Sequence, residues 1–162
     1  DGLKREIERC VAACHGSRTQ LFINDHWREA VAAGAYGVHL GQEDMDTADF
    51  AAIAAAGLRL GLSTHSLEEM DRALALHPSY VASGAVFPTA TKDMPTAPQG
   101  LERLRGQVVR AGGTPVVAIG GITLDNAADV LATGVASLAV VSAVTKAENP
   151  EAAVKAFQAL WK

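Results

Sequence analysis

The chain has 162 residues, of which 49% are apolar and 31 are alanine, a composition that predicts one domain with closely packed helices and sheet. The formal charge of −4 excludes a general nucleic-acid surface, and no apolar run approaches the roughly 20 residues of a membrane span. No secretory leader is visible, and Cys10 and Cys14 fit neither disulfide nor zinc spacing well, so we expect reduced thiols in a cytoplasmic protein.

Six short apolar runs alternate with amphipathic stretches along the chain. Because the runs are nearly continuous rather than alternating, they predict parallel strands covered on both faces. The predicted strands occupy residues 20–23, 36–40, 58–62, 80–86, 115–119 and 137–141. The predicted helices occupy residues 3–14, 25–33, 47–56, 66–76, 98–111, 124–133 and 149–161. This order predicts an α/β fold in which one helix precedes six strand–helix units.

Local signals agree with these elements. Ser66 and Glu69 have the spacing of a capping box, and four glycines follow predicted helix ends, where a residue without a β-carbon is favoured. These glycines are Gly34, Gly57, Gly112 and Gly134. The connection over residues 88–100 is much longer than the others, and a loop of that length after a strand is usually functional.

Polar residues follow the predicted strands at their carboxyl ends, where α/β folds collect their chemistry. Asp25 and Asp44 follow neighbouring strands, and their carboxylates suit Mg²⁺ bound together with a phosphate-bearing ligand. The alternative for each aspartate is a helix cap. His65 is the one histidine that we consider as an acid or base, whereas His39 is more simply a satisfied core imidazole.

Two further groups point to phosphate. Gly120 and Gly121 close an apolar strand before a helix, so their amides can approach an anion, and Ser142 after the next strand can share it. In the long loop, Lys92 with the hydroxyls of Thr89 and Thr91 supplies charge and hydrogen bonds that suit a departing diphosphate.

Six collinear motifs resemble the thiamin phosphate synthase family, and in detail its proteobacterial branch. They follow one another along essentially the whole chain: LFIND (21–25), GVHLGQEDM (37–45), LGLSTH (60–65), VFPTATK (86–92), AIGGI (118–122) and VVSA (140–143). The resemblance implies a TIM (β/α)8 barrel that couples hydroxymethylpyrimidine diphosphate with a thiazole (carboxylate) phosphate. The products are thiamin phosphate and pyrophosphate, and the diphosphate is expected to leave before the thiazole nitrogen attacks.

The resemblance also implies roles for individual residues. Asp25 and Asp44 would bind Mg²⁺, while Asn24, Ser63 and Lys92 would hold the pyrimidine diphosphate, with Ser63 and Lys92 as the catalytic pair. The residues implied for the thiazole phosphate are Thr89, Ala90, Thr91, Gly121, Val141 and Ser142.

One departure from the family is large. No Gln-x-Arg-x-Lys segment is present, and six strands are predicted where a barrel has eight, so we expect residues 1–162 to form one barrel domain that is incomplete at its N-terminal side. As it stands the chain is then a fragment or a form without activity. Two other functions stay open: a thiazole tautomerase using His65, or a non-catalytic protein that binds thiamin precursors. We expect small-molecule partners only, and the sequence leaves a homo-oligomer open.

Overall fold

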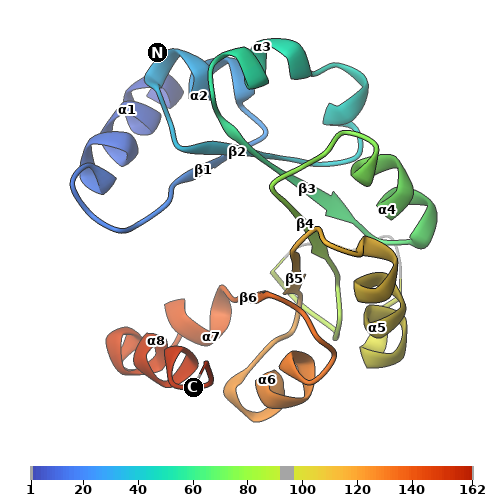
Figure 1. Cartoon of the computed structure of the whole chain (residues 1–162). Helices are drawn as coiled ribbons and strands as arrows, with labels where there is room; N and C mark the ends of the chain where they lie inside the picture. The colour runs from blue at the N-terminus through green and yellow to red at the C-terminus, as the bar shows by residue number, and fades with distance from the viewer. Residues whose placement is uncertain (1, 92–96, 162) are drawn as a thin grey trace.

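The structure is a computed structural model that describes residues 2–91 and 97–161. Within these residues six parallel strands form one sheet in which each strand pairs with the next along the chain. The strands are β1 Phe22–Asn24, β2 Gly37–Leu40, β3 Arg59–Thr64, β4 Tyr80–Ser83, β5 Val116–Ile119 and β6 Ser137–Ala139. Figure 1 shows the sheet curled, with the helices in an arc around it and α1 and α8 at the two ends of the arc. This curled half-barrel confirms the predicted α/β class.

The helices follow the strands as the sequence predicts. They are α1 Gly2–Cys14, α2 Trp27–Ala33, α3 Phe50–Ala55, α4 Leu67–Leu74, α5 Gly100–Ala111, α6 Leu124–Leu131, α7 Ser142–Thr145 and α8 Pro150–Gln158, with a short 3-10 helix η1 at Asp44–Asp46. Periodicity did not predict η1 or α7, because neither is long enough to show a repeating apolar face. The predicted fourth strand was also too long. β4 ends at Ser83, since the following segment turns toward β5, where Val86 N–H donates to the Ile119 carbonyl at 3.0 Å.

Helix ends show how local sequence positions these elements. Gly34 at the end of α2 has a φ of 64°, a left-handed conformation that favours glycine. At the start of α4, the Ser66 hydroxyl accepts from the Glu69 N–H at 3.2 Å, as a capping box requires. The second half of the predicted box is wrong, because the Glu69 carboxylate accepts from the N–H of His65 rather than of Ser66.

The core lies between the sheet and the helices. Val38, Leu40, Leu62 and Val81 of the central strands have no exposed surface, and they belong to one apolar cluster with helical side chains such as Met70. The sequence predicted that helices or other side chains cover both faces of the sheet. This prediction holds only for the outer face, which packs against the helices. On the inner face His39 and Ser63 are part-exposed, because they line a pocket.

We predict that Leu62→Ala lowers the free energy of unfolding by about 2–5 kcal/mol, because it leaves a cavity beneath the helices. Leu62 has no exposed surface on β3, which packs against α3 and α4. Urea denaturation measures the change, and Leu67→Ala is the control because Leu67 is 48% exposed. Equal losses of stability in the two variants would contradict this description of the core.

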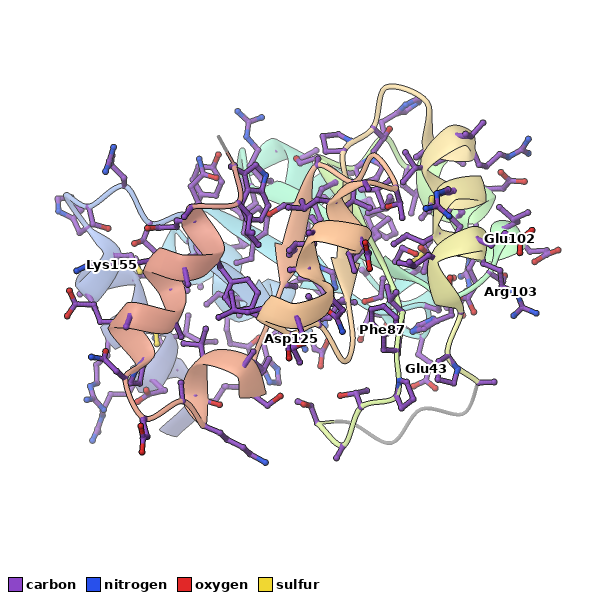
Figure 2. The ribbon with its side chains drawn as sticks, turned by 90° about the horizontal axis from the view of Figure 1, so that it is seen from below. Glu43, Phe87, Glu102, Arg103, Asp125 and Lys155 are labelled. Carbon is purple, nitrogen blue, oxygen red and sulfur yellow. The ribbon has the colours of Figure 1, made fainter. Side chains whose placement is uncertain are left out.

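Charged side chains lie on the outer sides of α5 and α8. Figure 2 shows Glu102 and Arg103 projecting from the outer side of α5, and Lys155 on α8 pairs with Glu151 at 2.6 Å. No helix in the described ranges is long and apolar enough to cross a membrane.

Candidate functional site

A pocket of about 300 Å³ lies at the carboxyl ends of the strands, as the polar residues there predict. Each of the six strands contributes residues to the pocket wall, either directly or through the loop that follows it. The lining residues are Asn24, His39, Ser63, Thr64, His65, Ala82, Gly84, Ala85, Thr89, Thr91, Ile119, Gly120, Gly121, Ile122, Ala139, Val140, Val141 and Ser142. The pocket therefore brings together seven of the predicted substrate ligands, which are Asn24, Ser63, Thr89, Thr91, Gly121, Val141 and Ser142.

Two predicted ligands are not placed in this wall. Ala90 is exposed and does not belong to the lining, although Thr89 and Thr91 on either side of it do. Lys92 lies outside the described residues, so its role remains a prediction.

Gly120 and Gly121 form a tight turn on one side of the pocket. Their φ angles are 100° and 66°, and a β-carbon on Gly120 would lie 2.6 Å from Cβ of Ala85. Their carbonyl oxygens accept from Phe87 N–H at 3.1 Å and from Asn126 Nδ2 at 3.1 Å. Within the described ranges no hydrogen bond holds either glycine N–H, so these amides are suited to a phosphate oxygen.

The other side of the pocket holds a polar network inside the half-barrel. His39 Nε2 lies 2.8 Å from Ser63 Oγ, and His39 Nδ1 lies 2.8 Å from the hydroxyl of Tyr80. Burial raises the pKa of Tyr80 to about 12, so its hydroxyl is protonated at neutral pH. Gln42 Nε2 donates to the Ser63 carbonyl at 2.6 Å, which ties the backbone of Ser63 to the loop after β2.

The two predicted metal ligands share a smaller, polar hollow beside this pocket. Asp25 and Asp44 both line it, and Asp25 directly follows Asn24 of the main pocket. Neither aspartate caps a helix through its side chain, since the N-caps of α2 and η1 are His26 and Glu43 and Asp44 Oδ2 instead accepts from Gly41 N–H at 2.9 Å. The left-handed φ of 64° at Asp25 is one that aspartate tolerates better than most residues.

This donor set fits Mg²⁺ bound through few protein ligands. The described residues contain no group of three or more acidic, histidine or cysteine side chains that could enclose a metal. Two carboxylates that share one hollow suit an ion that keeps waters and takes its other oxygens from a substrate.

His65 also lines the main pocket. Its Nδ1 lies 2.8 Å from Glu69 Oε2, and its backbone N–H donates to the same oxygen at 2.7 Å. The carboxylate therefore fixes the orientation of the imidazole at the pocket wall.

Comparison with known proteins decides the family. The family model described as thiamine monophosphate synthase matches residues 2–144. The chain belongs to this family. A thiamine-phosphate synthase of Neisseria meningitidis is 81% identical over 161 residues, which are 99% of this chain and 78% of the relative. One of Klebsiella pneumoniae is 59% identical over 96% of this chain and 74% of its own length.

Solved structures agree with this membership of the thiamine monophosphate synthase family. Thiamine phosphate pyrophosphorylase from Pyrococcus furiosus superposes with a TM-score of 0.81 and 36% identity, covering 97% of this chain and 76% of that one. A 3-hexulose-6-phosphate synthase from Salmonella typhimurium has a TM-score of 0.71 at 14% identity, and it shows the shared fold alone. The predicted family is therefore confirmed, whereas the individual site residues remain predictions supported by the geometry.

Family motifs and spacing did not indicate every residue of the site. Tyr80 was predicted only as the first residue of a strand, and its bond to His39 joins positions 41 residues apart. His39 is satisfied by partners, as expected, but it also lines the pocket. A signal was present in β2, where Gly37 and His39 occupy alternate positions facing away from the helix-covered Val38 and Leu40.

Proposed function

We propose that the full-length protein to which this barrel domain belongs couples a pyrimidinylmethyl diphosphate with a thiazole phosphate in the strand-end pocket, with Mg²⁺ held by Asp25 and Asp44. Membership of its family makes the chain an enzyme of thiamine biosynthesis, a transferase that releases pyrophosphate and forms thiamine phosphate. The observation that carries the proposed site is the pairing of two phosphate-suited walls around one pocket. One wall has the Gly120–Gly121 turn, and the other has Asn24 and Ser63.

The reaction breaks the bond between the pyrimidine methylene carbon and the diphosphate oxygen, and the electron pair leaves with pyrophosphate. The thiazole ring nitrogen then supplies the pair for the new bond to that carbon. Catalysis consequently depends on stabilising the leaving group and on positioning the nitrogen, rather than on a strong base. Mg²⁺, when bound, supplies neutralising charge to the diphosphate oxygens.

In this proposal the two substrates bind to different residues of the pocket wall. Asn24 and Ser63 bind the diphosphate substrate on the side of β1 and β3, with Lys92 as the cation at the leaving group. The thiazole phosphate binds to Gly121, Val141 and Ser142 together with Thr89 and Thr91, all of which line the pocket. The second substrate that we propose is a thiazole phosphate, with or without a ring carboxylate.

The remaining proposals concern the setting of the reaction. We place it in the cytoplasm, and the free Cys10 and Cys14 support a reducing compartment. Small molecules are the partners that the pocket supports, because its volume and mixed apolar and polar wall suit ligands of that size.

The direct test is to mix both substrates with the full-length protein and Mg²⁺ and to measure pyrophosphate. We expect one pyrophosphate for each thiamine phosphate, and we expect Lys92→Ala to lower kcat/KM about 10- to 100-fold through loss of a charged hydrogen bond. Lys155→Ala is the control, because Lys155 is an exposed lysine on α8 paired with Glu151. Absence of pyrophosphate from the wild type, or undiminished release from Lys92→Ala, would contradict the proposal.

A further inference from the structure

Tyr80 lies beneath the pocket rather than in its wall. It is the first residue of β4, and its ring stacks near that of His39 with centroids 5.6 Å apart and an interplanar angle of 22°. Phe22 meets the Tyr80 ring edge-on at 5.2 Å. On the neighbouring strand only glycine leaves room for the ring, because a β-carbon on Gly61 would lie 2.3 Å from Cζ of Tyr80. These neighbours fix where the phenol group lies.

The position of the phenol proton decides the direction of the next two hydrogen bonds. The Tyr80 hydroxyl keeps its proton at neutral pH, and among the described residues its one hydrogen-bond partner is His39 Nδ1 at 2.8 Å, so only donation to that nitrogen gives the phenol proton an acceptor. A neutral imidazole that accepts at Nδ1 carries its proton on Nε2. That N–H then donates to Ser63 Oγ, also at 2.8 Å. The hydroxyl proton of Ser63 is consequently directed away from His39.

We propose that Tyr80 is a positioning residue that selects the Nε2–H tautomer of His39 and thereby makes Ser63 a hydrogen-bond donor toward the diphosphate substrate. Ser63 lines the pocket whereas Tyr80 does not, so Tyr80 acts through His39. In the opposite tautomer Ser63 would donate to His39 and present only lone pairs to the pocket, which phosphate oxygens repel. The inference rests on the proposed function, in which Ser63 binds the diphosphate.

Kinetics test the effect on substrate. Tyr80→Phe keeps the ring and removes the donor, so we expect KM for the pyrimidine diphosphate to rise about tenfold while KM for the thiazole phosphate is unchanged. In a Ser63→Ala background Tyr80→Phe should have no further effect, because the group through which it acts is gone. Tyr36→Phe is the control, since Tyr36 contacts Phe22 in the same aromatic cluster and is 42% exposed. An unchanged KM in Tyr80→Phe, or an equal effect with and without Ser63, overturns the proposal.

A spectroscopic measurement tests the tautomer without reference to activity. In full-length protein labelled with ¹⁵N-histidine, the ring nitrogens of His39, assigned by their loss in His39→Gln, should show an Nε2–H imidazole. In Tyr80→Phe this tautomer should lose its dominance. A wild-type His39 protonated on Nδ1 alone overturns the inference, even if Tyr80→Phe does not fold. If the wild type releases no pyrophosphate, the proposed function is wrong. The measured tautomer of His39 still tests separately whether Tyr80 selects it.

Discussion

Gly120→Ala should lower kcat/KM about 100- to 1000-fold, the effect of losing a preformed group of anion donors. The φ of 100° at Gly120 is strained for alanine, and the added β-carbon would lie 2.6 Å from Cβ and 2.7 Å from Cα of Ala85. Relief of this contact requires the turn to move away from Ala85. Its amides would then leave the position that faces the pocket, so binding of the thiazole phosphate should weaken most.

The measurement is steady-state release of pyrophosphate with the thiazole phosphate varied, together with thermal unfolding of each variant. Gly113→Ala is the matched control, because a β-carbon there meets nothing within 4 Å. We expect that control to keep wild-type kinetics. If Gly120→Ala kept wild-type KM for the thiazole phosphate while folded, the turn would not bind that phosphate.

The fold was largely predictable because its elements are encoded locally. Each apolar run contains or overlaps an observed strand, and Gly34 ends its helix with the left-handed conformation that the sequence predicts. The errors occur where partners are distant in sequence. Val86 looked like the end of a strand, but its N–H donates to Ile119 after the chain has left β4. The two-face burial was predicted from apolar character alone, which does not distinguish a core from a pocket.

The position of the site was predictable because in parallel α/β folds functional residues gather at the carboxyl ends of the strands. Parallel strands bring their carboxyl ends to one edge, so Asn24, Ser63 and Gly121 meet although they are far apart in the chain. The rule does not give the contacts between side chains. Nothing in the spacing of His39 and Tyr80 shows that the two rings are hydrogen-bonded, because that contact depends on Gly61 leaving space between them.

The second large effect concerns Asp44. Asp44→Asn should raise the Mg²⁺ concentration for half-maximal activity at least tenfold and lower kcat/KM about 100-fold, because an amide is a neutral and weaker ligand than a carboxylate. Asparagine is nearly isosteric, and its carbonyl oxygen can still accept the Gly41 N–H that Asp44 Oδ2 accepts at 2.9 Å. The turn should therefore persist, so the change in activity reports the lost charge rather than a change in fold.

Asp46→Asn separates this effect from a general loss of negative charge. Asp46 lies two residues away, is exposed, and pairs with Arg72 at 2.5 Å rather than lining the hollow that Asp25 and Asp44 share. Calorimetric titration with pyrophosphate, with and without Mg²⁺, gives a readout independent of turnover. Asp44→Asn should lose the Mg²⁺-dependent part of pyrophosphate affinity, whereas Asp46→Asn should retain it. Equal Mg²⁺ dependence in the two variants would show that the metal is bound elsewhere, since each variant removes one negative charge and only Asp44 lines the hollow.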